Sequence, residues 1–210
     1  MNLSSQSFAD GERIPSEFAF AKAHPETHFT FAGNRSPHLA WDDVPAGTRS
    51  FALVCIDPDA PSVGDDVNQE GRTVAADLPR ADFHHWALAD LAADVRELAA
   101  GACADGVTPK GKSDPAGPAG SRQGRNDYTG WFAGDPDLGG TYLGYDGPAP
   151  PWNDEREHRY RFEVLALDVE RLDLPADFGV PELLAAAEGH VLARAALTGT
   201  YTQNPDLLQG

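Results

Sequence analysis

Proline and glycine divide this chain into short segments, and that division is the strongest constraint on its fold. The sequence contains 17 prolines and 21 glycines. Short apolar runs bounded by such turn residues are typical of all-β domains. We therefore predict a mainly β fold, with strands at residues 29–32, 50–56, 84–89, 141–143 and 160–167.

One helix is expected, near the C-terminus. Proline suits a first helical turn, so the helix begins at Pro181, and apolar residues recur at helical spacing as far as Leu192. Gly199 follows as a helix stop. The segment 101–140 is rich in glycine, proline, aspartate and serine, and we predict that it forms a long loop.

The length of 210 residues suits one domain with a sizeable core, so we expect a single domain over residues 1–210. No apolar run approaches the roughly 20 residues that a membrane-spanning helix needs. The polar start of the chain lacks the pattern of a signal peptide. Two cysteines, Cys55 and Cys103, are too few for a disulfide framework, which favours a reducing, cytoplasmic setting.

The chain is strongly acidic, with 33 aspartate and glutamate residues, 16 lysine and arginine residues and a formal net charge of -17. Such a surface repels phosphate backbones and anionic membranes, so neither nucleic acid nor stable membrane insertion is expected. The charge is typical of a densely hydrated surface suited to solubility or to high salt. A specific basic protein partner is the alternative interpretation.

Three short runs combine ionisable residues with strand-like apolar segments. They are Asp-Pro-Asp-Ala-Pro at 57–61, His-His-Trp at 84–86 and His-Arg-Tyr at 158–160. Acids and histidines that converge at the ends of several strands would form a polar pocket, where function concentrates. In that interpretation a cis peptide bond before Pro61 would aim the acids. A tight turn at 57–61 and histidines packed in a β core are the competing interpretations.

Strand alternation limits which of these side chains can share a pocket. It places His84 and His85 on opposite faces, His85 with Phe83 and His84 with Trp86. Only one of the two imidazoles can therefore reach a given cavity. In the strand that follows residue 157, His158 is the first residue of the apolar face.

A match to the phosphate-loop pattern at 106–113 is rejected. That mechanism needs a strand before the loop and a helix that begins at its Lys-Ser pair. Here the preceding residues are small and loop-like, and the Asp-Pro-Ala-Gly-Pro run at 114–118 cannot continue as a helix.

Further motifs occur in a fixed order along the chain. They are Phe-Ala-Asp-Gly at 8–11, Asn-Arg-Ser-Pro-His-Leu-Ala-Trp at 34–41, Asn-Asp-Tyr at 126–128 and Gly-Tyr-Asp-Gly-Pro at 144–148. With these motifs and the three runs above, the sequence resembles the phosphatidylethanolamine-binding protein family, in its bacterial and archaeal branch often called Raf kinase inhibitor-like. The resemblance extends nearly from end to end, and so many motifs in order make it specific.

The resemblance implies an antiparallel β-sandwich of Greek-key type, with a C-terminal helix and long loops. It also implies a small cavity that takes phosphate-like or carboxylate anions, including phospholipid headgroups, with no cofactor and no catalytic residue. Carried over to the matching positions, it implies a ligand-binding pocket made of Asp57, Asp59, His85, Pro151, His158 and Tyr160.

Two segments depart from the family pattern. Residues 154–157, Asp-Glu-Arg-Glu, occupy a stretch where the family usually has a glycine, and we expect an acidic rim there. Residues 62–82 form a long connection that is expected to cover the pocket entrance.

The preferred interpretation is a non-enzymatic binding and regulatory protein whose anion affinity rises as the pH falls through the titration of its pocket histidines. Two alternatives stay open. A metal-dependent hydrolase would use two acids and two histidines as zinc or manganese ligands. An inhibitor of a protein partner would act through the acidic surface. The four ligands of the hydrolase would be Asp57, Asp59, His85 and His158.

Overall fold

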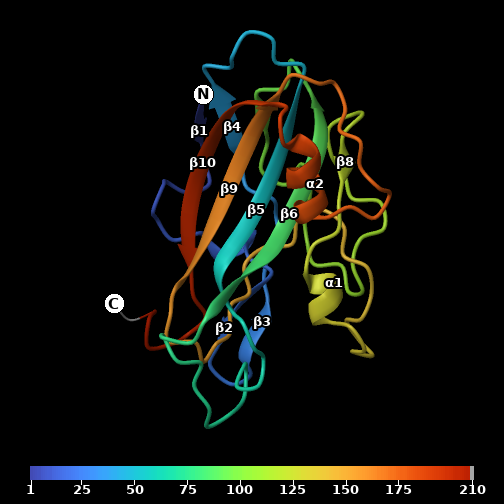
Figure 1. Cartoon of the computed structure of the whole chain (residues 1–210). Coiled ribbons are helices and arrows are strands. Elements are labelled where there is room, and N and C mark those ends of the chain that lie inside the picture. Colours follow the sequence, from blue (N-terminus) through green and yellow to red (C-terminus); the bar gives the residue numbers. More distant parts are fainter. Residues whose placement is uncertain (209–210) are drawn as a thin grey trace.

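A computed structural model describes residues 1–208 of the chain. Its largest sheet has five strands, and every pair of neighbouring strands in it is antiparallel. Figure 1 shows the long, twisted strands at its centre. The strand order β9-β5-β6-β8 within it is that of a Greek key, as predicted. Across the sheet the strands are β10 (Val191–Tyr201), β9 (His158–Leu167), β5 (Ser50–Pro61), β6 (Arg80–Ala92) and β8 (Arg122–Gln123).

A smaller three-stranded sheet packs against one face of the large sheet. It consists of β1 (Asn2–Ser4), β4 (Leu39–Asp42) and β7 (Glu97–Leu98). A separate hairpin is formed by β2 (Ala21–His24) and β3 (His28–Phe31), after the short 3-10 helix η1 (Ser16–Phe18).

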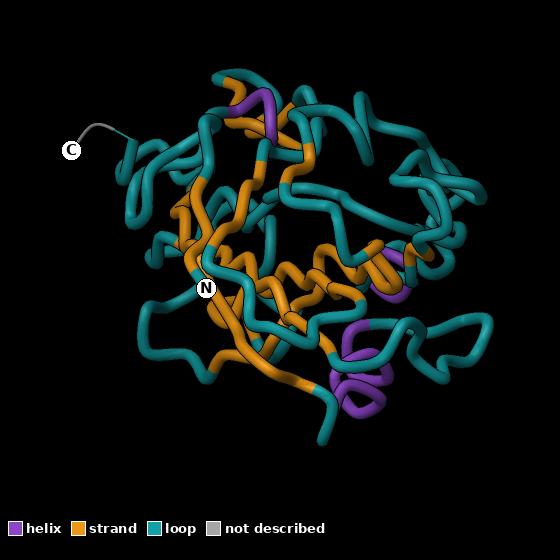
Figure 2. Tube along the Cα trace, turned by 90° about the horizontal axis from the view of Figure 1, so that it is seen from above, coloured by secondary structure: helices purple, strands orange, loops and turns teal. Residues whose placement is uncertain are grey.

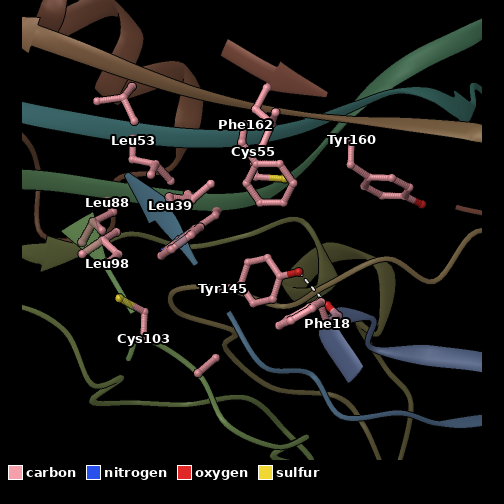
Figure 3. Packing of buried hydrophobic residues seen from close by; sticks show 14 of the residues in the cluster. Phe18, Leu39, Leu53, Cys55, Leu88, Leu98, Cys103, Tyr145, Tyr160 and Phe162 are labelled. Atoms are coloured by element: carbon pink, nitrogen blue, oxygen red, sulfur yellow. Dashed lines mark hydrogen bonds between the residues drawn. The ribbon is translucent and has the colours of Figure 1, made fainter. Parts of the chain in front are cut away.

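The main core lies between the two sheets. Figure 3 shows Leu53 and Phe162 of the large sheet together with Leu39 and Leu98 of the small one. All four side chains are buried. Their burial follows from period-2 alternation, which turns every second side chain of an antiparallel strand to the same face. The mainly β fold class is therefore confirmed.

A second core covers the outer face of the large sheet. Helix α2 (Val180–Ala187) lies over β5 and β6 in Figure 1, and its Leu183 packs with Val54 of β5. The upper half of the large sheet is thus buried on both faces, which explains the continuous apolar run of β5. Figure 2 shows the strands at the centre of the molecule with the loops around them.

The predicted C-terminal helix is much too long. Helix α2 ends at Ala187, and residues 191–201 form strand β10 instead. Gly189, with φ +82°, turns the chain between the two elements. In β10 burial alternates from one residue to the next, which is the two-residue repeat of a strand. Leu192, at helical spacing from the leucines of α2, concealed this repeat. Gly199 is not a helix stop but lies within β10, where a Cβ would approach Ile14 Cγ1 to 2.4 Å.

The other predicted elements differ mainly in length. Strands β5, β6 and β9 contain the predicted segments and extend beyond them. No strand forms at 141–143, where Leu143 makes only an isolated bridge to Arg125. The segment 101–140 is mostly irregular, as predicted, and contains β8 and the short helix α1 (Tyr128–Trp131). Within residues 1–208, no helix is long and apolar enough to span a membrane.

Candidate functional site

A cavity of about 120 Å³ lies where β5, β6 and β9 leave the core. It is closed from the side by α1, by the connection between β5 and β6, and by the proline-rich residues 149–151. Five of the six predicted pocket residues line it, and Asp59 does not. The five are Asp57, His85, Pro151, His158 and Tyr160.

A β-bulge turns His85 toward this cavity. Cys55 of β5 pairs with Trp86 of β6, and the next residue, Ile56, pairs with His84. One residue of β6, His85, is therefore extra, so His85 and Trp86 are both buried on the inner side of the sheet. The prediction that Trp86 shares a face with His84 is wrong for this reason. His84 itself is partly exposed, and its Nδ1 lies 2.9 Å from Asp127 Oδ2.

A second bulge turns Asp59 away from the cavity. Asp57 pairs with Phe83 and Ala60 pairs with Ala81, so two residues of β5 oppose one residue of β6. Asp59 is the second of those two, and it lies on the opposite side of the strand from Asp57. The prediction that Asp59 lines the pocket is therefore wrong. The prediction of a cis peptide bond before Pro61 is also wrong, because no peptide bond in residues 1–208 is cis. The bulge, and not a cis bond, directs the two acids.

The buried carboxylate of Asp59 binds arginines instead of facing a ligand. Its Oδ2 accepts from Arg159 Nε at 2.8 Å, and its Oδ1 accepts from Arg159 Nη2 at 3.0 Å and from Arg156 at 3.2 Å. Burial favours the neutral acid, but the hydrogen bonds and charge of Arg159 outweigh it and lower the pKa of Asp59. Asp59 is an ionised structural residue that anchors β9 to the end of β5.

His158 lies between two buried carboxylates. Its Nδ1 donates to Asp57 Oδ2 at 2.7 Å, and its Nε2 donates to Asp154 Oδ2 at 3.0 Å. Burial disfavours the charged ring, but the hydrogen bonds to Asp154 and Asp57 and their charges outweigh it and raise the pKa of His158 to about 9. At neutral pH this residue is an imidazolium that compensates the charge of Asp57.

The stretch 154–157 does not form the expected acidic rim. Asp154 is buried and is bound by Arg80, whose Nη2 donates at 3.0 Å. Arg156 contacts the carboxylate of Asp59, and Glu157 accepts from Arg13. Asp154, Arg156 and Glu157 are thus in internal pairs, and the exposed Glu155 accepts from the amide of Ala76. None of the four residues lines the cavity.

The ring of His85 is held by a buried polar network. Its Nδ1 donates to the carbonyl oxygen of Asp146 at 2.8 Å. The Asp146 carboxylate in turn accepts from Asn34 at 2.7 Å, from Asn126 at 2.8 Å and from Lys112 at 2.6 Å. The motifs at 34–41, 126–128 and 144–148 therefore supply a framework for His85. Lys112 belongs to this framework too, rather than to a phosphate loop.

His85 is the neutral histidine of the cavity. Burial lowers its pKa, and the nearby charge of Asp57 offsets that effect only in part. In the neutral ring the proton is on Nδ1, which donates it in the hydrogen bond to the Asp146 carbonyl oxygen. Nε2 is therefore an acceptor, and within residues 1–208 it has no hydrogen-bond partner.

Comparison with known proteins identifies the family of this chain. Residues 4–202 match the family model described as phosphatidylethanolamine-binding protein. The chain belongs to the phosphatidylethanolamine-binding protein family. The family predicted from the sequence is thereby confirmed.

Similar members of the family occur in bacteria and archaea. UPF0098 protein YbhB of Escherichia coli (strain K12) is 34% identical over 202 residues, which cover 96% of this chain and 100% of YbhB. A UPF0098 protein of Methanothermobacter thermautotrophicus is 36% identical over 202 residues, covering 96% of this chain and 98% of that protein.

Solved structures of the family have the same fold. The crystal structure of Escherichia coli YbcL, described as a new member of the mammalian PEBP family, matches with a TM-score of 0.68 and 26% identity over 96% of this chain and 97% of that one. The homologue CT736 of Chlamydia trachomatis matches with a TM-score of 0.61 and 27% identity over 95% of each chain.

Several residues of this family member's cavity were not predicted from the sequence. Aromatic walls come from Phe83, Tyr128 and Trp131, and the connection between β5 and β6 contributes Val67 and Asn68. Tyr128 lies in the Asn-Asp-Tyr motif, which could have indicated it. Strand alternation had already placed Phe83 on the face of His85. The other three gave no signal, because isolated apolar or amide residues are common outside strands. We expected residues 62–82 to cover the pocket entrance, and Val67 and Asn68 of this connection do line the cavity.

The four residues named for a metal-dependent hydrolase do not form one ligand set. Asp59 faces away from the cavity, and both ring nitrogens of His158 are bound to carboxylates. Within residues 1–208, no group of three or more His, Cys, Asp or Glu side chains is arranged to hold a metal ion. The donor set therefore does not fit zinc or manganese at this position.

Proposed function

We propose that this protein binds a small anion, phosphate or a phosphate-bearing headgroup, in the cavity between β5, β6 and β9, and that it catalyses no reaction there. The observation that carries the proposal is the pairing of Asp57 with a charged His158 beside the unpartnered Nε2 of His85. Membership of the family supports the same kind of site.

The charges of the cavity explain how an anion could enter it. A lone carboxylate would repel phosphate, but the imidazolium of His158 compensates Asp57. Neutral His85 accepts a hydrogen bond at Nε2, so it suits an anion that carries its own proton. Once protonated, the same nitrogen donates to an anion in a charge-assisted bond.

Binding is therefore expected to strengthen as the pH falls, through His85 alone. The pKa of His158, about 9, keeps that ring charged throughout the range from pH 5 to 8. The pKa of His85 is lowered, so this ring gains its proton only below its ordinary value of about 6.5. The sequence-based hypothesis in which both histidines titrate is thus narrowed to one of them.

The hydrogen bonds that the polar groups of the cavity already make favour a binding role over catalysis. Asp57 Oδ1 accepts from the amide of Asp59 at 2.8 Å and Oδ2 accepts from the charged His158, and both hydrogen bonds stabilise the carboxylate and weaken it as a general base. His85 is the remaining base, and among residues 1–208 no serine, threonine, cysteine or lysine lines the cavity beside it.

Calorimetry with phosphate and with sulfate from pH 5 to pH 8 tests the proposal. Sulfate does not titrate in this range, so its affinity reports the protein alone. Affinity for sulfate should rise about tenfold or more toward pH 5, the size of one charge-assisted hydrogen bond. His85→Gln should abolish the rise, whereas the matched control His84→Gln should keep it, because His84 faces outward. Undetectable binding of both anions to the unaltered protein would contradict the proposal.

A protein partner is the second candidate, and the net charge of -17 favours a basic one. Such an interaction would survive His85→Gln and would weaken with added salt. We also infer a reducing compartment, because Cys55 and Cys103 are both free and buried.

A further inference from the structure

Asp154 binds His158 on the side of the ring away from Asp57, and its role was not predicted from the sequence. Asp154 does not line the cavity, yet its side chain is only 1% exposed and reaches the far nitrogen of His158 at 3.0 Å. Its other oxygen accepts from Arg80 Nη2 at 3.0 Å and from the amide of Arg156 at 2.9 Å. The backbone around it is fixed as well, because Asn204 Nδ2 donates to the Asp154 carbonyl at 2.7 Å.

We propose that Asp154 is a positioning residue of the pocket, which holds the ring of His158 at its second nitrogen and so keeps Nδ1–H directed at Asp57. The proposal rests on the proposed function, because its consequence is the affinity for an anion beside Asp57.

The reason lies in how imidazole forms hydrogen bonds. A ring with one carboxylate partner can satisfy it as a neutral tautomer, and its charge then depends on the pH. A ring held between Asp57 and Asp154 needs a proton on both nitrogens to satisfy both acceptors. Asp154 thereby keeps His158 charged, and Arg80 in turn compensates Asp154.

The groups that face His158 support this interpretation from every side. Asp57 of β5 and Asp154 bind its nitrogens, and Arg80 of β6 binds Asp154. Burial and the charge of Asp57 raise the pKa of Tyr160, so this residue is a neutral phenol. His85 is neutral by burial. Two acids and two bases therefore balance, and the cavity carries no net charge against an entering anion.

The same segment also fixes the wall of the pocket. Asn153, the neighbour of Asp154, donates to the carbonyls of Asp66 at 2.8 Å and Arg72 at 3.1 Å, and it accepts from the amide of Asn68 at 3.0 Å. Asn68 lines the cavity. The side chain that orients His158 thus belongs to the segment that holds the wall beside it.

The first test uses the unaltered protein without any ligand. Nitrogen-15 NMR of the histidine rings should show His158 protonated at both nitrogens from pH 6 to pH 8, with an Nε2–H signal shifted downfield by a strong acceptor. A His158 ring that loses a proton within this range, or an Nε2–H exposed to solvent exchange, would overturn the proposal. This outcome is independent of whether any anion binds.

The second test compares Asp154→Asn with Glu155→Gln by NMR and by sulfate calorimetry. Both changes replace a carboxylate by an amide in adjacent residues, but Glu155 is exposed. Asp154→Asn should let His158 titrate between pH 6 and 8 and should weaken sulfate binding about tenfold at pH 8, while pH 5.5 restores it. Glu155→Gln should change neither quantity. Equal losses at both pH values would indicate a purely structural role, against the proposal. If the unaltered protein binds no anion, the proposed function is wrong, while the NMR result still decides whether Asp154 keeps His158 protonated.

Discussion

At the residue scale, the buried imidazolium of His158 couples the pocket to the stability of the fold. Both of its nitrogens bind carboxylates in the native state, and these partners are lost when the chain unfolds. The free energy of unfolding must therefore depend on the pH wherever native and unfolded His158 differ in protonation.

The direction of that dependence follows from the raised pKa of His158, which changes from 6.5 to about 9. The stabilisation is fully present below pH 6.5 and is lost as the pH rises through 9, and it amounts to on the order of 3 kcal/mol. Urea unfolding at pH 6.5 and pH 9.5 measures it. The unaltered protein should lose this amount relative to His158→Gln, and equal pH dependence in both proteins would refute the assignment.

Asp59 offers a contrast at the same scale, because it is buried close to the pocket but does not belong to it. Asp59→Asn should weaken the bidentate contact with Arg159 and lower the free energy of unfolding by about 1–3 kcal/mol. Phosphate affinity should stay unchanged within about twofold. Asp82→Asn is the matched control, because Asp82 is an exposed acid opposite the same bulge and should leave both quantities unaltered. A large loss of phosphate affinity in Asp59→Asn would show that Asp59 belongs to the binding site, against this assignment.

At the scale of secondary-structure elements, the two β-bulges decide which side chains meet in the cavity. One adds His85 to the inner face of β6, and the other removes Asp59 from the face of Asp57. Bulges shift every following residue by one place, so they re-aim side chains without changing the strands around them.

Element packing also determines where glycine is required. Gly199 of β10 lies against the N-terminal segment, and a Cβ there would be 2.4 Å from Ile14 Cγ1 and 2.9 Å from Phe8 Cε2. Gly199→Ala should therefore lower the free energy of unfolding by about 1–3 kcal/mol through overpacking. Gly130→Ala in α1 is the control, because nothing lies within 4 Å of its Cβ position. Thermal unfolding that ranks the two variants in the opposite order would contradict this packing.

The sequence predicted the elements better than it predicted their details. Proline and glycine punctuation indicated a β fold, and alternation located β9, because both signals are local. The bulge at His85 breaks alternation without a local signal, so the partner face of Trp86 was predicted wrongly. The end of α2 was missed because Leu192 continues a helical spacing by coincidence.

The same limit applies to the pocket. Five of its residues followed from the family resemblance, whereas the role of Asp154 could not be predicted. An acidic run such as 154–157 is usually solvated, so nothing in the sequence indicated a buried carboxylate in it. The residue that compensates the buried charge of Asp154 is Arg80, which is 74 positions away in the chain. Long-range pairs of this kind appear only once the strands are placed.

At the scale of the whole molecule, the cavity is an electrically balanced site within a strongly acidic protein. The formal net charge is -17, so most acids lie on the surface and repel one another. Salt screens the long-range repulsion of an anion, while the proposed short contact of a bound anion with His85 Nε2 should be affected much less.

Salt should accordingly stabilise the fold. The midpoint of thermal unfolding should rise by several degrees as potassium chloride increases from about 0.1 M to 1 M at pH 7. At pH 4.5, close to the sequence pI of 4.5, the rise should shrink because the net charge is small. A midpoint that falls with salt at pH 7 would show that the surface acids are already compensated by local pairs.

The most direct measurement is a crystal structure of the protein grown at pH 5.5 with phosphate. Phosphate should occupy the cavity between β5, β6 and β9, with an oxygen about 3 Å from His85 Nε2 and the His158 ring still between Asp57 and Asp154. A cavity that holds only water while phosphate binds elsewhere on the molecule would contradict anion binding at this site.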